Sequence, residues 1–233
     1  PKDLSIEELR KLQSALSEFD GFQKPDSSCL SPIGIEVFKA GVIKEFQPEF
    51  CAGTQRKPSS YEGHPFIVEA VIAYGGKIEA KEEVAVYRFA NKIPLLYDEG
   101  SDVITQVIRE IDWKRYHVMP NMPVAVFVHI ASTKIPFGRL GKEYIAKREE
   151  IAREVDLAVR EVARKLGEYL SRKKREEYLM KKEERLRKNA KEVSRLMSIV
   201  LKMPQEEIYS LFDQLIREHL KKHGLMRGGN SGE

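Results

Sequence analysis

The sequence contains few of the features that stabilise secreted domains or carry a chain across a membrane. Its only cysteines are Cys29 and Cys51, and their separation matches no common metal-ligand spacing. No apolar run approaches the ~18 residues that a membrane-spanning helix needs, and no signal-peptide pattern opens the chain. We therefore predict reduced thiols, a cytoplasmic location and no membrane partner. Because the first residue is Pro1 and a helical pattern follows at once, we interpret the chain as a piece of a longer polypeptide.

Signatures of catalysis are also missing. Segment 138–143 (GRLGKE) has neither the spacing nor the final Ser or Thr of a phosphate-binding loop. The five histidines form no metal-ligand pair, and His219 and His223, four residues apart on a predicted terminal helix, are expected to lie on a solvated surface. No Ser–His–Asp or Cys–His arrangement can be assigned. We therefore expect no catalytic residue and no metal site within this chain.

Positive charge is concentrated in one segment. The whole chain carries a formal net charge of +4, whereas residues 171–191 contain ten basic and four acidic residues. Opposite charges four residues apart, such as Glu177 with Lys181 and Glu184 with Lys188, are compatible with a solvated helix whose charges pair with one another. The local basic excess also suits a surface that binds a polyanion. The sequence leaves both interpretations open.

Hydrophobic periodicity predicts an α/β fold. Runs rich in β-branched and aromatic residues indicate strands, and the largely apolar run around Glu69 is typical of a strand covered on both faces. Helices are expected where apolar residues recur every three or four positions, the first with a capping box of Ser5 and Glu8 and a later one capped by Ser101. The expected elements are helix 4–19, loop 24–34, a short helix at 35–47, loop 52–65, strands 66–74 and 84–90, helix 101–111, strand 124–131 and loop 132–142.

From Glu149 onward the pattern is helical. It predicts one helix from 149 to about 187, whose length at 1.5 Å per residue exceeds what a small sheet can cover, so its charged half should project. Two shorter helices are expected at about 189–202 and 205–222, the second starting at Pro204. The tail from Gly224 is predicted to be unstructured.

Five sequence blocks between residues 25 and 170 follow one another in a recognisable order. They are 61–69 (YEGHPFIVE), 73–76 (AYGG), 88–97 (RFANKIPLLY), 112–116 (DWKRY) and 129–137 (HIASTKIPF). These blocks resemble the transducer of topoisomerase VI B subunits, and the helical continuation to about residue 222 is similar to that of the archaeal members.

This resemblance implies a place among the type IIB topoisomerases, isomerases that use ATP to pass one DNA duplex through a transient double-strand break and relax supercoils. In that family the B subunit joins a GHKL-type ATPase domain, a helical insert and the transducer. The A subunit carries the cleaving tyrosine and the metal site, and two A and two B subunits form a heterotetramer. ATP with Mg²⁺ would be bound mainly by the ATPase domain. Since these 233 residues include neither the ATPase site nor the cleavage site, the implied enzyme activity belongs to the complete assembly.

The resemblance also implies roles for particular residues. Lys134, in the family's Ser-Thr-Lys-Val-Pro-Phe-like loop, would reach into the ATP site and sense the γ-phosphate; Ile135 replaces the usual valine here. Trp113, Lys114 and Tyr116 would form a Trp-Lys-x-Tyr patch that touches DNA. An equally weighted alternative is that the two aromatic residues close the core and Lys114 is merely exposed.

Two further expectations concern partner binding by the basic segment 171–191 and by the helices that follow it. Among the basic residues of 171–191, the candidate DNA contacts are Arg172, Lys173, Lys174 and Arg175. The helices after Lys188 are expected to dock on the A subunit through apolar stripes. The residues of these stripes are Leu196, Ile199, Val200, Ile208, Leu211, Phe212 and Leu215.

We therefore predict an α/β chain made of a two-layer transducer sheet with helices on one face, a long projecting helix and a small helical tail. The expected boundaries are 1–24 for the end of a helical insert, 25–62 for a connecting segment, 63–170 for the transducer, 171–223 for the basic stem and terminal helices, and 224–233 for a tail. The predicted partners are duplex DNA, the A subunit and a second B subunit. The alternative is a stand-alone nucleic-acid-binding or scaffold module that uses only the basic helix.

Overall fold

The computed structural model describes residues 4–19, 21, 25–96, 99–138 and 144–222. The predicted tail from Gly224 and part of the predicted loop 132–142 lie outside these ranges. The helices are α1 (Ile6–Glu18), α2 (Ile35–Phe46), α3 (Val103–Glu110), α4 (Glu149–Leu201) and α5 (Gln205–Lys222), with 3-10 turns at Glu99–Ser101 and Trp113–Tyr116. The strands are β1 (Phe50–Gln55), β2 (Ser59–Tyr61), β3 (His64–Tyr74), β4 (Ala85–Ala90), β5 (Ile93–Leu95) and β6 (Val124–Ser132). The chain divides into two compact units, Pro1–Leu166 and Gly167–Glu233.

The first unit contains one mixed sheet with the order β1-β3-β6-β4-β5, and β2 pairs with the start of β3. The two central strands are antiparallel and in register from Phe66 opposite Ser132 to Tyr74 opposite Val124. Strand β4 runs parallel to β6, so the chain between them, which includes α3, forms a crossover connection. The strands 66–74, 84–90 and 124–131 predicted from the sequence are β3, β4 and β6.

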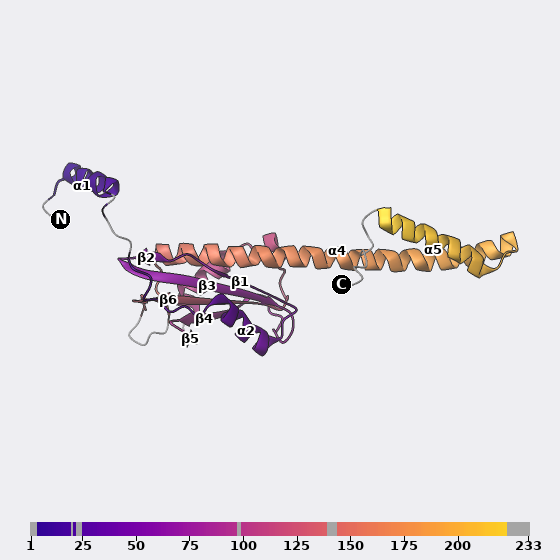
Figure 1. The fold of residues 1–233 in the computed structure, drawn as a ribbon, viewed down its shortest axis with the longest axis horizontal. Helices are drawn as coiled ribbons and strands as arrows, with labels where there is room; N and C mark the ends of the chain where they lie inside the picture. Colours follow the sequence, from indigo (N-terminus) through magenta and orange to yellow (C-terminus); the bar gives the residue numbers. More distant parts are fainter. Residues whose placement is uncertain (1–3, 20, 22–24, 97–98, 139–143, 223–233) are drawn as a thin grey trace. The chain divides into compact units, whose positions relative to one another are not determined.

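Helices cover both faces of the sheet (Figure 1). On one face, Phe38 and Val42 of α2 pack against Val71 and Phe127. On the other face, α4 supplies a buried apolar stripe that includes Ile151, Val155, Val162 and Leu166, all with no exposed surface. The predicted α/β class is confirmed, with one addition: helices were expected on one face, and α2 covers the second face as well.

The middle helix starts one residue later than predicted, because Asp102 and not Ser101 is its N-cap. Asp102 Oδ1 accepts the N–H of Ile104 at 2.9 Å, and Oδ2 accepts the N–H of Ile145 at 2.8 Å. Ser101 belongs to the preceding 3-10 turn. Serine and aspartate both cap helices well, so local sequence does not choose between Ser101 and Asp102. The hydrogen bond from Ile145, which is distant in the chain, favours Asp102. The capping box of Ser5 and Glu8 is confirmed.

The prediction that residues 52–65 form a loop was wrong. Half of this segment lies in β1 and β2, which pair one after the other along the same edge of β3, and its last two residues begin β3 itself. The segment has few β-branched residues, and it is extended because β3 offers a free edge. Gly53 permits the start of α2 to lie close to this edge, since a Cβ at that position would lie 2.6 Å from Ile35 Cδ1.

The predicted break near residue 188 was also wrong, because α4 is one helix of 53 residues. Asn189 lies within it and costs only about 0.7 kcal/mol relative to alanine, too little to end a helix. The helix ends where Lys202 adopts the left-handed conformation (φ 50°) just before Pro204, as is usual for a C-terminus. Among the described helices, none combines the length and the apolarity needed to cross a bilayer.

Candidate functional site

The backbone around Lys134 is held by hydrogen bonds immediately after strand β6. The N–H of Lys134 donates to Ser132 Oγ at 3.2 Å, and the Tyr61 hydroxyl donates to the carbonyl oxygen of Lys134. Ser132 Oγ also lies 3.0 Å from the carbonyl oxygen of Pro65. The Lys134 side chain itself is exposed. The structure therefore presents an exposed cationic side chain on a fixed backbone at the end of a central strand.

The turn between β4 and β5 is bonded to the start of the same loop. Asn91 Nδ2 donates to the carbonyl oxygen of Ser132 at 3.0 Å, and the N–H of Ser132 donates to Asn91 Oδ1 at 2.9 Å. Asn91 and Lys92 both have positive φ values, 47° and 69°, as a two-residue hairpin turn of type I′ requires. Lys92 Nζ donates to Ser31 Oγ at 2.9 Å. A second lysine thus lies on a turn that is joined to the Lys134 loop.

A small basin of about 260 Å³ lies between this turn and the loop. It is lined by Cys29, Leu30, Ser31, Asn91, Lys92, Ser132 and Thr133. None of these residues is acidic, and they offer an ammonium group, hydroxyls and an amide. Such groups suit phosphate oxygens, so the residues present fit an anionic ligand. Among the described parts of the chain, no group of three His, Cys, Asp or Glu residues could hold a metal ion.

Beneath the turn, a buried carboxylate and imidazole connect three segments. Glu69 Oε2 lies 2.7 Å from His129 Nδ1, and the Glu69 carboxylate also accepts the N–H groups of Ile33 and Gly34 at 2.8 Å each. His129 Nε2 accepts the N–H of Lys92 at 3.0 Å, so the ring is neutral and carries its proton on Nδ1. Burial acts to raise the pKa of Glu69, but the hydrogen bonds from His129, Ile33 and Gly34 outweigh it and lower that pKa.

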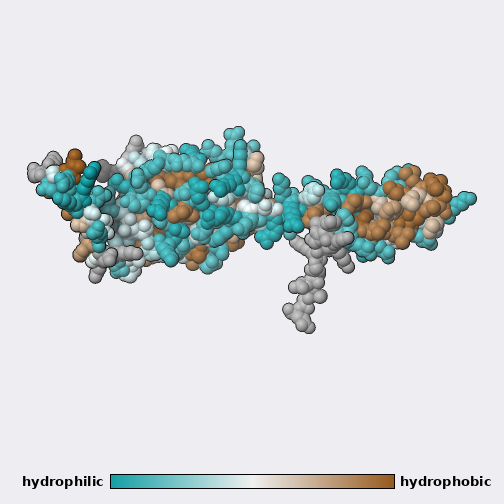
Figure 2. All heavy atoms as spheres, turned by 90° about the horizontal axis from the view of Figure 1, so that it is seen from above, coloured by the Kyte–Doolittle hydropathy of each residue, from teal (hydrophilic) through white to brown (hydrophobic). Residues whose placement is uncertain are grey.

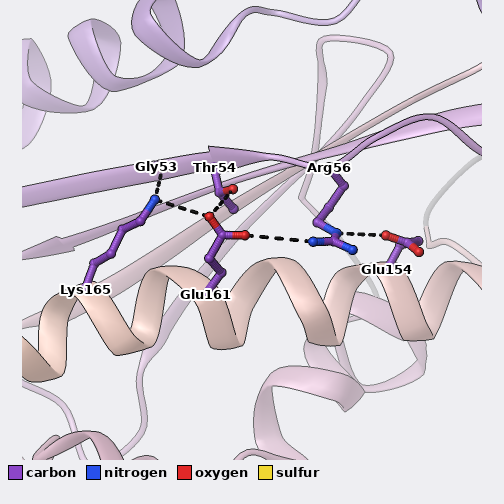
Figure 3. Close-up of polar contacts among 6 residues, drawn as sticks. All are labelled: Gly53, Thr54, Arg56, Glu154, Glu161 and Lys165. Carbon is purple, nitrogen blue, oxygen red and sulfur yellow. Dashed lines mark hydrogen bonds and ion pairs between the residues drawn. The ribbon is translucent and has the colours of Figure 1, made fainter.

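A polar cluster joins strand β1 to helix α4 (Figure 3). Arg56 Nε donates to Glu154 Oε2 at 2.9 Å, and Thr54 Oγ1 donates to Glu161 Oε1 at 2.7 Å. Lys165 Nζ lies 3.0 Å from the carbonyl oxygen of Gly53 and 3.3 Å from Glu161. The Thr54 hydroxyl is the main cause of the lowered pKa of Glu161. We name these residues the β1–α4 cluster; they fix α4 in register along the edge of the sheet.

The predicted aromatic patch lies in the 3-10 turn before β6. Trp113 is half-buried and its indole N–H donates to the carbonyl oxygen of Ile108 at 3.0 Å. Tyr116 is half-buried, and its ring meets that of Trp113 edge-on with the ring centroids 6.5 Å apart. Lys114 is exposed. The two aromatic side chains are therefore partly engaged within the fold, and the lysine is the group open to a ligand.

In the second unit, the first residues of the basic segment are accessible. Arg172, Lys174 and Arg175 are exposed, and Lys173 is half-buried. Arg187 pairs instead within the unit, with Glu183 at 2.9 Å and with Asp213 of α5, and these hydrogen bonds raise its pKa. The segment therefore combines self-paired charges and accessible basic residues.

The same unit has a broad apolar surface, which Figure 2 shows in brown. Leu196, Ile199, Val200, Leu211 and Leu215 of the predicted docking stripes are exposed, Ile199 by 72% and Val200 by 80%. Ile208 is buried, and Phe212 packs beside the small core of Ala190, Ile216 and Leu220. The surface also includes Val193, Met197, Leu201 and Met203.

Sequence reasoning missed most of the residues around Lys134 and all of the β1–α4 cluster. Asn91-Lys92 is a hairpin-turn pair whose signal was available, whereas the bond from Asn91 to Ser132 joins residues far apart in the chain. Arg56 and Thr54 lay in the segment predicted to be a loop. No local pattern could have paired them with Glu154 and Glu161.

Comparison with known proteins places these features in a family. Residues 25–182 match the family model described as "Topoisomerase VI B subunit, transducer". Two relatives, from Saccharolobus islandicus and Saccharolobus solfataricus, are each named as the B subunit of type 2 DNA topoisomerase 6. Each is 45% identical over 222 residues, which are 95% of this chain and 42% of the relative. The chain thus spans less than half the length of these relatives. A solved B subunit of DNA gyrase from Myxococcus xanthus aligns over 58% of this chain and 40% of its own, with 13% identity and a TM-score of 0.38, a likeness too low to support further argument.

Proposed function

Because the chain belongs to the family of topoisomerase VI B-subunit transducers, we propose that it is the transmission module of an ATP-driven type II DNA topoisomerase. It would couple ATP binding and hydrolysis to the passage of one DNA duplex through another. The observation that carries this proposal is Lys134, an exposed ammonium on a backbone fixed to a central strand. ATP, with Mg²⁺ held outside this chain, supplies the γ-phosphate; Lys134 is the group of this chain that would bind it, with Lys92 close by on the bonded turn.

Helix α4 is the element that would transmit an ATP-dependent displacement of the sheet to the second unit. Its first half is attached to the sheet by the buried stripe and by the β1–α4 cluster, and the same unbroken helix continues into the second unit. Because a continuous helix moves as one element, a displacement of the sheet by the Lys134 contact would reach the second unit through α4.

Weakening the β1–α4 cluster should therefore reduce the coupling of ATP hydrolysis to strand passage more than it reduces the folding stability of the chain. In the complete enzyme, Arg56→Gln removes the half-buried ion pair with Glu154, which is worth about 0.2–1 kcal/mol if it is valued like a pair that solvent still reaches. We expect ATP consumed per strand passage to rise by roughly 1.4-fold to fivefold, which is that free energy expressed as a ratio. The measurement is ATP turnover and plasmid relaxation in one reaction. Glu79→Gln, which breaks an exposed pair with Lys81, is the control; a ratio unchanged in Arg56→Gln would show that the cluster is only structural.

The second unit would hold the two macromolecular partners on different surfaces. The accessible basic residues near Arg172 suit the phosphates of duplex DNA, to which Lys114 of the first unit would add a contact. The exposed apolar surface of α4 and α5 suits a protein partner, for which the family indicates the A subunit of an assembly of two A and two B subunits.

Two variants should separate these surfaces, and each serves as the control for the other. Changing Arg172, Lys173, Lys174 and Arg175 to Glu should abolish salt-sensitive binding of duplex DNA, since that binding depends on phosphate neutralisation, and leave co-purification with the A subunit intact. Changing Ile199 and Val200 to Gln should do the reverse. The measurements are DNA binding at several salt concentrations and pull-down of the A subunit. The assignment fails if both variants lose the same partner.

The alternative, a stand-alone nucleic-acid-binding module, is favoured by the basic segment alone. It predicts DNA binding by the chain with no dependence on Lys134. The cytoplasmic location remains a prediction from the sequence.

A further inference from the structure

The basin of about 260 Å³ beside the β4–β5 turn is built from three segments that are far apart in the chain. Its walls are residues 29–31, the turn residues Asn91 and Lys92, and residues 132–133. We name it the Lys92 basin. Lys134 is not one of its lining residues, so the basin is separate from the side chain to which the proposed function assigns the γ-phosphate.

A buried pair fixes the first two walls relative to each other. The Glu69 carboxylate has no exposed surface and accepts the N–H groups of residues 33–34, which follow the first wall. His129 is also fully buried; its Nδ1 lies 2.7 Å from Glu69, and its Nε2 accepts the N–H of Lys92 in the second wall. Both walls are therefore attached to the same buried carboxylate and imidazole.

The third wall is attached to the second by the side chain of Asn91. Its amide group donates to the carbonyl oxygen of Ser132 and accepts the N–H of the same residue. Ser132 is only 5% exposed, and its hydroxyl donates to the carbonyl oxygen of Pro65. A basin whose walls are already held in place loses little conformational entropy when a ligand binds.

The lining residues offer hydrogen-bond donors from different walls. Lys92 Nζ donates to Ser31 Oγ at 2.9 Å. An ammonium has three N–H donors, and this bond uses one of them. The Ser31 hydroxyl accepts from the lysine, so its own proton can be donated to a ligand. Thr133, which is exposed in the third wall, adds another hydroxyl.

Negative charge is absent from the described lining of the basin, since none of the lining residues is acidic. Asp26, on the segment that leads to the first wall, uses its two carboxylate oxygens to accept the N–H and the hydroxyl of Ser28 at 2.9 and 2.7 Å. Glu69 lies beneath the turn without exposed surface. The Lys92 ammonium is thus the charged group of the lining, and it favours an anion.

The size and the donor types of the basin narrow the choice of anion. Its volume of about 260 Å³ is below the ~300–1,000 Å³ that is typical of sites for drug-sized molecules, so it suits a single small group. A planar carboxylate is matched best by the planar fork of arginine, and no arginine is among the described lining residues. A compact ammonium with hydroxyl donors on other walls suits the several oxygens of a phosphate group.

We propose that the Lys92 basin binds one phosphate group, which Lys92 holds through its ammonium and Ser31 and Thr133 hold through their hydroxyl groups. The group is either the free ion or the terminal phosphate of a nucleotide. The binding itself follows from the basin alone, whereas ATP as the origin of the phosphate rests on the proposed function. Lys92 thereby becomes a second phosphate-binding lysine beside Lys134.

Titrating inorganic phosphate into the 233-residue chain tests the site directly, with the backbone amides of Lys92, Ser132 and Thr133 followed by NMR. Saturable shifts of these amide signals are expected, and sodium chloride at the same ionic strength should not reproduce them. Shifts that do not saturate, or equal shifts with chloride, would overturn the proposal.

Three variants show which groups hold the ion. Lys92→Met should weaken phosphate binding by about tenfold or more, which is the value of a hydrogen bond to a charged group; since this side chain is exposed, the fold should be retained. Ser31→Ala keeps the charge of the basin and should also weaken binding. Lys44→Met removes an exposed lysine in the last turn of α2 and should bind phosphate as the natural chain does. If Lys92→Met and Lys44→Met behave alike, or if Ser31→Ala loses no affinity, the attraction is unspecific and the proposal fails.

The complete enzyme identifies the source of the phosphate. If the free ion is the ligand, phosphate should inhibit ATP hydrolysis, and Lys92→Met should raise the inhibition constant about tenfold. If the terminal phosphate of the bound nucleotide is the ligand, Lys92→Met should raise the KM for ATP by a similar factor. A change in neither constant would overturn the assignment. Failure of the proposed function has a different signature, namely near-normal activity of Lys134→Ala while the 233-residue chain still binds phosphate.

Discussion

Replacing Lys134 with alanine in the complete, assembled topoisomerase should reduce ATP hydrolysis and strand passage together by about tenfold or more. A hydrogen bond between charged groups is worth about 1.5–3 kcal/mol. The contact between Lys134 and the γ-phosphate exists only while ATP is bound, so its loss would shift the equilibrium between the ATP-bound and ATP-free arrangements of the enzyme. The fold should be unaffected, because the bonds around Lys134 use its backbone N–H and C=O. ATP turnover and plasmid relaxation are the measurements.

Two controls belong with this variant. Lys147→Ala removes another exposed lysine of the first unit and should leave both activities unchanged. Lys134→Arg should restore activity only partly, because a planar guanidinium does not replace a compact ammonium. Near-normal rates in a folded Lys134→Ala enzyme would show that Lys134 is an ordinary surface residue and would remove the main support for the proposed function.

Replacing Glu69 with glutamine should destabilise the first unit by about 3 kcal/mol, as expected when buried N–H donors lose a charged acceptor. The carboxylate accepts from His129, Ile33 and Gly34, whereas an amide offers one acceptor oxygen and turns two donors toward other donors. For a unit of this size the melting temperature should fall by about 10 °C. Thermal unfolding by circular dichroism measures it. Glu110→Gln, on an exposed residue of α3, should change nothing.

The same carboxylate predicts a dependence of stability on pH. Since hydrogen bonds lower the pKa of Glu69 in the folded chain below its usual value of 4.5, its contribution is fully present above that value and is lost as the pH falls through the folded pKa. The melting temperature of the natural chain should therefore fall in this acidic range, and that of Glu69→Gln should fall less. Equal acid sensitivity of the two would contradict the ionised state assigned to Glu69.

The fold was largely predictable because its main elements have strong local signals. The apolar strands β3 and β6 and the stripe of α4 from Ile151 to Leu166 are regular over long runs, and burial follows directly from such patterns. The site was predictable in one residue, Lys134, and there the resemblance to a family supplied the role. Asn91, Lys92 and the β1–α4 cluster were not predictable, because each acts through a partner far away in the sequence.

The sequence by itself determined the α/β class, the family, the central strands and the helical second half, since these depend on periodicity and on motifs that are local in the chain. Only the tertiary structure decided that residues 50–55 and 59–61 are strands, that Asp102 caps α3 and that α4 is continuous. The strands depend on pairing with β3, and the cap depends on Ile145, which is distant in the chain. The continuity of α4 depends on the absence of a residue before Lys202 that is unfavourable enough to end a helix.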